Sequence, residues 1–307
     1  MNPLDVEACA SALKAGELVI LPTETVYGLG ADAADPVAVA RVFEAKGRPR
    51  FNPLIAHVAD AAHGAQIARF DGRAEALAER FWPGPLTLVL PVRDEQAVCD
   101  LARAGLSSVA VRSPGHGAAR AVIAAFGGAV VAPSANRSGR PSPTTYADAM
   151  EETGGHAGAS LDGGPCAVGL ESTVVSLLDG EVRLLRPGSI TRAEIAEVVG
   201  DLSGSEAEAH RSPGRMSLHY APDAPVRINV DARPLGGVLI GFGQGMADAD
   251  FNLSESGDLR EAAANLFRML READRRKPEL IAVARVPDDG LGEAINDRLR
   301  RAAGFVG

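Results

Sequence analysis

The first 200 positions alternate between short apolar runs and longer stretches in which apolar residues recur with helical spacing. Residues 18–21, Leu-Val-Ile-Leu, form an unbroken apolar run that is typical of a strand buried on both faces. A helix is expected to begin at Pro36, with Asp35 as its N-cap, and to end at Gly47. Similar patterns predict helices at 3–14, 73–81 and 117–126 and strands at 54–58, 86–90, 108–111 and 129–132.

Two later apolar runs, 173–178 and 182–185, flank the dipeptide Asp179-Gly180, which is a hairpin signal. Because a hairpin adds an antiparallel pair, the predicted sheet is mixed. The segment Thr191-Arg-Ala-Glu194 then reads as a capping box that opens one more helix. The pattern therefore predicts an α/β domain over residues 1–200, with a mixed sheet and flanking helices.

The periodicity stops at residues 201–224, where small, polar and proline residues dominate, so a linker is expected there. Beyond it, strand-like runs alternate with a helix opened by Asp258. This alternation predicts a second, smaller Rossmann-like α/β domain over residues 225–307. The strand candidates are 226–230, 238–242 and 280–286, and the apolar face of the helix comprises Leu259, Ala262, Leu266, Met269, Leu270 and Ala273.

Composition narrows the class of protein. A chain of 307 residues with 46% hydrophobic residues is long enough for two ordinary globular domains. The three cysteines, Cys9, Cys99 and Cys166, lack metal-ligand or redox spacing, so a reducing compartment is expected. The N-terminus carries acidic rather than basic residues, and no apolar run approaches membrane-spanning length. We therefore expect a soluble cytoplasmic protein that has no membrane partner.

The formal net charge of −9 bears on nucleic-acid binding. An acidic chain gains little from sequence-independent attraction to a phosphate backbone. Binding of tRNA is therefore expected to be weak or indirect.

The loop after the first strand carries polar groups that suit a ligand. Thr23, Thr25 and Tyr27 offer hydroxyls at alternate positions, and Gly28 and Gly30 would let the backbone turn tightly beside a small molecule. Glycine-rich turns after strands are also common without any ligand. The loop alone is therefore weak evidence for a binding site.

Positive charge follows at the end of the next helix. Lys46, Arg48 and Arg50 place an ammonium and two guanidinium groups within five residues, which suits a phosphate or a carboxylate. Basic residues at a helix C-terminus also stabilise the helix dipole without any ligand. The combination with the preceding hydroxyl-rich loop favours a site for a small anionic substrate.

Seven short segments, spread over most of residues 1–200, carry the strongest signal in the sequence. They are Pro22-Thr-Glu-Thr-Val-Tyr-Gly-Leu29, Lys46-Gly-Arg48 with Asn52-Pro-Leu54, Phe81-Trp-Pro-Gly-Pro-Leu-Thr87, Val111-Arg-Ser-Pro114, Ala132-Pro-Ser-Ala-Asn136-Arg-Ser-Gly139, Glu171-Ser-Thr-Val174 and Arg186-Pro-Gly188. Together these segments resemble the YrdC-like family of threonylcarbamoyl-AMP synthases. They keep the order of the family, which makes the resemblance a specific match.

The resemblance implies a YrdC-like catalytic domain and a reaction. In this family, L-threonine, bicarbonate and ATP give threonylcarbamoyl-adenylate and pyrophosphate. The product passes to a downstream transferase complex that modifies adenosine at tRNA position 37. The sequence shows no ordered set of carboxylates for a metal, so magnesium is expected to arrive with ATP, held by its phosphates and water.

The resemblance also assigns residues to L-threonine. Arg112 would pair with the carboxylate of threonine, and Ser172 would hydrogen-bond the same group. His57 has a structural alternative, because a single histidine at the end of an apolar strand is often a satisfied core residue. The complete set carried over for L-threonine is Thr25, His57, Arg112, Ala132 and Ser172.

A second set is implied for ATP. Lys46 and Arg48 would offset charge on the phosphates as catalytic residues, with no covalent nucleophile. Tyr220, in the linker, would close over the nucleotide, although Arg215-Met-Ser-Leu218 is less basic than the same part of the linker in the family. The complete set carried over for ATP is Arg48, Asn52, Ser108, Ser134, Asn136, Ser142, Arg186 and Tyr220.

Two other functions are compatible with a domain of this kind. An RNA-binding, translation-associated module would bind RNA without making an adenylate, but the net acidity and the 4% aromatic content disfavour it. A carbamoyl-transfer maturation factor would carry an acylphosphatase-like segment and zinc-type cysteine pairs, and the sequence has neither. The resemblance therefore favours the adenylate synthase.

Overall fold

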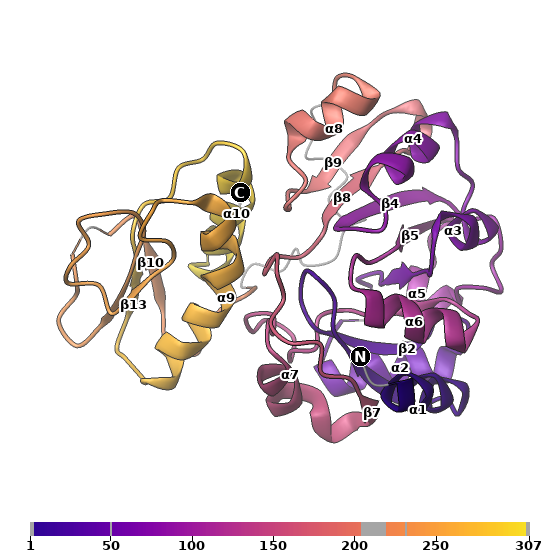
Figure 1. The fold of residues 1–307 in the computed structure, drawn as a ribbon, viewed down its shortest axis with the longest axis horizontal. Coiled ribbons are helices and arrows are strands. Elements are labelled where there is room, and N and C mark those ends of the chain that lie inside the picture. Colours follow the sequence, from indigo (N-terminus) through magenta and orange to yellow (C-terminus); the bar gives the residue numbers. More distant parts are fainter. Residues whose placement is uncertain (1–2, 50, 204–218, 231, 305–307) are drawn as a thin grey trace.

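The computed structural model describes residues 3–49, 51–203, 219–230 and 232–304. Two α/β units lie side by side in it, each with its own sheet (Figure 1). The predicted fold class is confirmed, with a large mixed sheet in the N-terminal part and a smaller sheet in the C-terminal part. Most of the predicted linker, residues 204–218, lies outside the described residues, and this includes the weakly basic stretch 215–218.

The larger sheet has nine strands in the described part of the chain and mixes parallel with antiparallel pairs. The hairpin predicted around Asp179-Gly180 joins β8 to β9, and both of these turn residues have positive φ. The strand order is β7 (Ala157–Ser160), β1 (Leu18–Leu21), β2 (Gly28–Asp32), β6 (Val130–Val131), β3 (Ile55–His57), β5 (Ser108–Arg112), β4 (Leu86–Pro91), β8 (Thr173–Ser176) and β9 (Arg183–Arg186).

Helices cover the two faces of this sheet unequally. Val19 and Leu21 of β1 pack with α1 and α6, whereas Leu18 and Ile20 pack with α2 on the opposite face. This alternation is the period of two expected for a strand buried on both faces. The helices are α1 (Pro3–Lys14), α2 (Pro36–Lys46), α3 (Ala61–Ile67), α4 (Gly72–Phe81), α5 (Asp100–Arg103), α6 (Gly117–Phe126), α7 (Tyr146–Thr153) and α8 (Arg192–Val199).

The expectation that Gly28 and Gly30 form a tight turn beside a ligand is wrong. Both residues belong to strand β2, which pairs with β1. A Cβ at Gly28 would lie 3.0 Å from the Cβ of Ala132, and one at Gly30 would lie 2.9 Å from a Val19 methyl. These glycines therefore allow neighbouring strands and loops to pack closely.

In residues 219–230 and 232–304, the smaller sheet consists of four parallel strands packed against two helices. Asp258 caps the first helix as predicted, and the apolar face of that helix is buried apart from its first residue, Leu259. The sequence patterns did not predict the second helix. The order is β10 (Val226–Ile228), β13 (Ile281–Val283), β11 (Val238–Gly241) and β12 (Phe251–Asn252), with helices α9 (Leu259–Arg275) and α10 (Leu291–Ala302).

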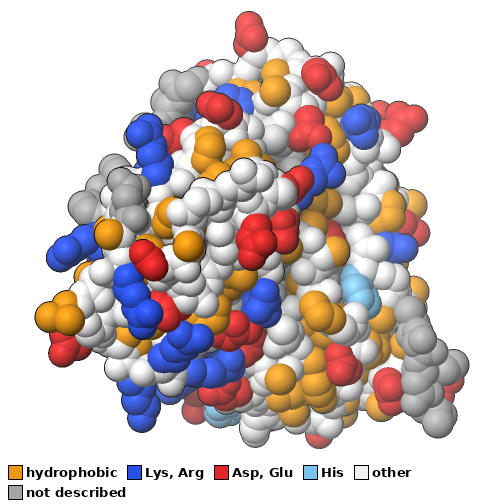
Figure 2. Space-filling view, turned by 60° about the vertical axis from the view of Figure 1, so that its left-hand side comes forward, with side chains coloured by type: hydrophobic (Ala, Val, Ile, Leu, Met, Phe, Trp, Pro, Cys, Tyr) orange, Lys and Arg blue, Asp and Glu red, His pale blue; other side chains and the backbone are white. Residues whose placement is uncertain are grey.

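Helix α9 docks the smaller unit onto α7 of the larger one. Arg271 forms an ion pair with Glu152 at 3.0 Å, and Arg275 forms one with Asp148 at 2.5 Å. Acidic and basic side chains also lie interspersed over the face seen in Figure 2, where the smaller unit comes forward. None of the described helices has the length and apolar character that crossing a membrane requires.

Candidate active site

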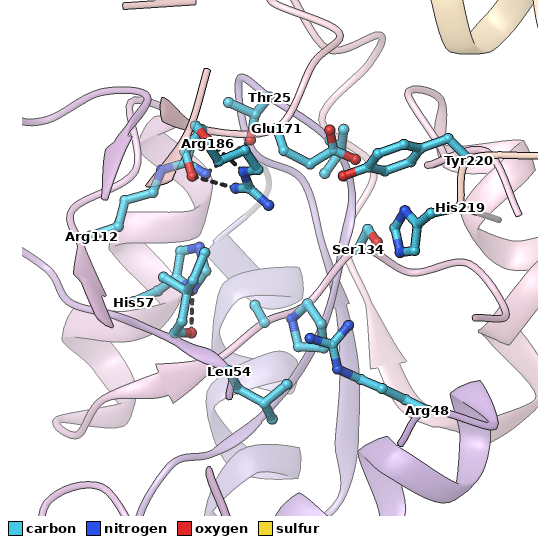
Figure 3. Close-up of a pocket in the computed structure, with 15 residues that line it drawn as sticks. Thr25, Arg48, Leu54, His57, Arg112, Ser134, Glu171, Arg186, His219 and Tyr220 are labelled. Carbon is cyan, nitrogen blue, oxygen red and sulfur yellow. Dashed lines mark hydrogen bonds between the residues drawn. The ribbon is translucent and has the colours of Figure 1, made fainter. Parts of the chain in front are cut away.

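The register of two parallel strands sets one end of a pocket. His57 of β3 lies directly beside Arg112 of β5. Val109 and Val111 of β5 pack into the apolar cluster with α2 and α4, so Arg112 points to the opposite face of the sheet. On that face the chain leaves a pocket that both His57 and Arg112 line (Figure 3).

Arg112 is held by contacts from three directions. Its Nε donates to Gly84 O at 3.1 Å, its Nη1 to Thr25 Oγ1 at 3.0 Å and its Nη2 to Glu24 Oε1 at 2.5 Å. A guanidinium has further N–H donors. Arg112 is therefore oriented by the protein and keeps donors for a carboxylate in the pocket.

The opposite side of the pocket is built by the loop after β6. Ser134 forms an isolated bridge with Gly28 and lines the pocket. The buried ammonium of Lys46 donates to the carbonyl oxygens of Ser134 and Asn136. Burial, together with the charge of Arg48, lowers the pKa of Lys46 well below its usual value. Lys46 thus fixes the position of this loop without itself lining the pocket.

The β8–β9 hairpin supplies a further arginine. Arg186 donates from Nε to Ser172 O and from Nη2 to Ser172 Oγ, both at 3.0 Å. Ser172 Oγ lies 2.7 Å from Thr87 Oγ1, so its position is fixed from both sides. Figure 3 shows the Arg186 guanidinium directed into the pocket between Arg112 and Tyr220.

Three guanidinium groups therefore line one pocket, those of the buried Arg112 and Arg186 and of the partly buried Arg48. Of these three arginines, only Arg112 forms an ion pair with a carboxylate among the described residues. Burial lowers the pKa of Arg48 to about 10 and also lowers the pKa of Arg186. Arg48 Nε has no hydrogen-bond partner in the described part of the chain. Buried cations with unused donors favour an anionic ligand.

Two linker residues enter the same pocket. His219 and Tyr220 line it near Arg48, and their rings meet edge to face at 4.0 Å (Figure 3). Burial, with the charge of Arg48 adding to it, lowers the pKa of His219 well below its usual value. Burial and the nearby Glu171 raise the pKa of Tyr220 to about 12. Both side chains are therefore neutral near pH 7.

The pocket gathers nine of the residues that the sequence nominated. Residues from both predicted binding sets lie around one hollow, with His57 and Arg112 on one side and Arg48 and Ser134 on the other (Figure 3). The nine are Thr25, Arg48, His57, Arg112, Ala132, Ser134, Ser172, Arg186 and Tyr220.

Five nominated residues do not line the pocket. Lys46 and Asn136 belong to the loop support behind Ser134, and Ser142 Oγ donates to Glu171 Oε1 at 2.5 Å. Ser108 begins β5, at the opposite end of that strand from Arg112. Asn52 is buried, and its backbone N–H donates to Pro49 O. Their contact with a substrate remains a prediction.

The hydroxyls of Thr23 and Tyr27 have structural roles, contrary to expectation. Thr23 Oγ1 donates to Val26 O at 2.6 Å within its own loop. Tyr27 is buried, and its hydroxyl donates to Gly164 O at 2.7 Å. Thr25 is the hydroxyl of this loop that lines the pocket.

Three residues with evident roles in the site were not nominated from the sequence. Glu24 orients Arg112, and Glu171 and His219 line the pocket. Glu24 and Glu171 lie within the matching segments and His219 lies in the linker, next to nominated Thr25, Ser172 and Tyr220, respectively. Their position beside those residues was the available signal.

Comparison with known families agrees with this geometry. A family model described as telomere recombination matches residues 11–188. A second model, described as the threonylcarbamoyl-AMP synthase C-terminal domain, matches residues 190–304. The chain belongs to the threonylcarbamoyl-AMP synthase family. The two matched segments contain the larger and the smaller sheet, respectively.

Relatives in this threonylcarbamoyl-AMP synthase family match over almost their full length. The chain is 39% identical to the threonylcarbamoyl-AMP synthase of Pyrococcus abyssi, over 98% of this chain and 94% of the relative. It is also 39% identical to that of Bacillus subtilis, over 99% and 94%. A crystal structure of P. abyssi Sua5 complexed with L-threonine superposes with a TM-score of 0.90, at 39% identity, covering 99% of this chain and 96% of that one.

Proposed function

We propose that this protein is an L-threonylcarbamoyladenylate synthase, a nucleotidyltransferase that joins L-threonine, bicarbonate and ATP. The observation that carries the proposal is the convergence of three arginines on one pocket, Arg112 and Arg186 buried and Arg48 partly buried. The two reactants of the adenylation step, the threonine carbamate and ATP, are both anionic. Family membership and the threonine complex of the P. abyssi relative support the same assignment.

The reaction does not require a covalent nucleophile on the enzyme. The neutral amine of threonine forms a carbamate, either by adding carbon dioxide and losing a proton or by condensing with bicarbonate and releasing water. A carbamate oxygen then attacks the α-phosphorus of ATP, the bond between the α-phosphorus and its bridging oxygen breaks, and pyrophosphate leaves. Catalysis comes from alignment of the two reactants and from cations that offset the charge on the phosphates.

The two sides of the pocket suit the two reactants. Arg112, oriented by Glu24 and Thr25, is placed to bind the threonine carboxylate beside His57. Arg48 and Ser134 lie on the other side, where the phosphates of ATP would bind. Arg186 lies between these groups in Figure 3 and would contact the phosphate that carbamate attacks.

Magnesium would come with the nucleotide. Glu171 is the carboxylate among the described pocket-lining residues, and its two oxygens already accept from Ser142 and Arg298. No cluster of three or more His, Cys, Asp or Glu side chains in the described part of the chain could hold a metal ion. These residues do not fit a dedicated metal site, and the phosphates and water would hold the ion.

The product fits a further group-transfer step. A carbamoyl group activated as an adenylate is an acyl donor, and its consumer would be a transferase complex acting on adenosine at tRNA position 37. Direct tRNA binding by this chain is not required for that sequence of steps.

The test is pyrophosphate release from ATP by the purified protein. Release should require both L-threonine and bicarbonate, and each should be omitted in turn. Release that proceeds equally without threonine would refute the proposal. Salt-sensitive RNA binding without ATP turnover would point instead to an RNA-binding module.

A further inference from the structure

A buried arginine of the smaller unit, Arg298, contacts the larger unit. Arg298 of α10 has no solvent-exposed surface, although it carries a full charge. Its Nε donates to Glu171 Oε2 at 3.1 Å, and its Nη1 donates to Pro187 O at 2.6 Å and Asp297 Oδ2 at 3.0 Å. Burying a charge is costly unless partners compensate it. Two of these partners, Glu171 and Pro187, come from the larger unit.

Glu171 connects Arg298 to the pocket. The Glu171 side chain lines the pocket, and its other oxygen accepts from Ser142 Oγ at 2.5 Å. The next residue, Ser172, accepts both hydrogen bonds from Arg186. Arg298 therefore contacts the chain on either side of the Arg186–Ser172 pair. It binds Glu171, which precedes Ser172, and Pro187, which follows Arg186.

Arg298 also lies against the linker. Its guanidinium carbon is 5.7 Å from the centre of the Tyr220 ring, which packs on Phe267 of α9 at 5.3 Å. The His219 backbone N–H donates to Arg301 O of α10 at 3.4 Å. A cation beneath an aromatic face stabilises the position of that ring. The wall of the pocket formed by His219 and Tyr220 is thus held by the smaller unit.

Ion pairs other than those of Arg298 also dock the two units together. Arg271 and Arg275 of α9 reach Glu152 and Asp148 of α7, and neither of these carboxylates lines the pocket. Arg298 differs from these arginines because its carboxylate partner faces the reactants. A role limited to docking does not explain that placement.

We infer that Arg298 is a positioning residue for the nucleotide side of the pocket, acting through Glu171 and Tyr220. This inference rests on the proposed function. Without Arg298, the carboxylate of Glu171 would face the triphosphate as an uncompensated negative charge and would repel it. The smaller unit would then supply the charge that makes the pocket competent for ATP, while threonine binding depends on contacts within the larger unit.

The first measurement is binding of a non-hydrolysable ATP analogue and of L-threonine, each by calorimetry. Arg298→Gln should weaken analogue binding by at least about tenfold and leave threonine binding within about twofold. Arg298→Lys keeps the charge and should recover part of the loss. Arg300→Gln is the matched control, because Arg300 lies on the same helix and pairs with the exposed Asp288.

A double-mutant cycle separates positioning from general destabilisation. If Arg298 acts through Glu171, then Arg298→Gln in a Glu171→Gln background should change analogue affinity by less than about threefold. The double variant removes both charges together, so it also serves if Arg298→Gln alone fails to fold. Equal losses in the two backgrounds, or parallel losses of threonine and analogue binding, would overturn the inference.

These measurements do not depend on turnover. A wild-type protein that binds the analogue but releases no pyrophosphate would refute the proposed function, and the binding comparison would still decide the role of Arg298. A wild-type protein that does not bind the analogue would overturn both.

Discussion

Glu24 joins Arg112 to the backbone of Gly115. Oε1 of Glu24 accepts from Arg112 Nη2 at 2.5 Å, and Oε2 accepts from the backbone N–H of Gly115 at 2.8 Å. Burial alone would raise the pKa of the Glu24 carboxyl, but the charge of Arg112 and the Gly115 N–H outweigh it and lower that pKa. The carboxylate is therefore ionised near pH 7 and fixes the direction of the guanidinium.

Glu24→Gln should lower the free energy of unfolding by about 1 to 3 kcal/mol. The amide puts a donor NH2 group in place of one of the two oxygens, so either Arg112 or the Gly115 N–H faces a donor and loses its acceptor. Urea denaturation at pH 7 measures the change. Glu44→Gln, at an exposed position of α2, should stay within about 0.5 kcal/mol of wild type. Equal stabilities of the two variants would show that the pair contributes nothing.

Arg48→Ala should slow adenylate formation about tenfold to a hundredfold or more at limiting ATP. Arg48 is partly buried beside His219 and Tyr220, and its buried Nε has no partner in the described part of the chain, so its charge is available to phosphate. Steady-state pyrophosphate release at several ATP concentrations measures the effect. Arg41→Ala is the control, since Arg41 lies exposed on the preceding helix. An unchanged rate would place Arg48 outside the site.

The sequence predicted the helix ends that are fixed by capping residues close in the chain. Asp35 caps α2 through a hydrogen bond to the Val37 N–H, and Gly47 ends that helix in the left-handed conformation. Thr191 and Glu194 form the capping box of α8. These features depend on residues within a few positions of one another, and this is why a single sequence reveals them.

Elements that depend on tertiary packing were not predicted. Strand β2 contains two glycines in five residues and resembles a turn, but its pairing with β1 and the close approach of Ala132 to Gly28 make it a strand. Helix α10 was missed although Leu299 and Ile295 are buried. Packing between distant segments overrode local preference in β2.

The sequence predicted the binding residues of the candidate site but not the long-range contacts that support them. Motif residues named Arg48, Arg112 and Arg186 as binding groups, and the structure places all three around one pocket. The sequence did not reveal that Lys46 serves the loop behind Ser134, or that Arg298 reaches Glu171 from the other unit. Such partnerships join residues about 90 to 130 positions apart, and no local pattern encodes them.

Serine should be a poorer substrate than threonine by about tenfold or more in kcat/KM. The pocket carries apolar side chains beside its polar groups, including Val26, Leu54, Ile55 and Ala132. A methyl group buried against such a wall adds binding energy that serine cannot gain. Adenylate formation with each amino acid in turn measures the preference. Equal kcat/KM values would mean that the threonine methyl does not contact this wall.

Protonation of His57 should destabilise the folded protein in acid. Burial, with the charge of Arg112 adding to it, lowers the pKa of His57 to about 3. The ordinary pKa is 6.5, so below that pH the unfolded chain binds a proton that the folded chain does not. Stability is therefore complete above pH 6.5 and falls as the pH drops toward 3, by about 1.4 kcal/mol per unit.

The measurement is urea denaturation of wild type and His57→Gln at several pH values between about 4 and 7. The variant should lose stability less steeply than wild type as the pH falls, because it lacks the group that takes up the proton. His156→Gln, at an exposed position, should keep the slope of wild type. Identical slopes for all three proteins would mean that His57 titrates alike in the folded and unfolded chain, which contradicts a neutral imidazole beside Arg112.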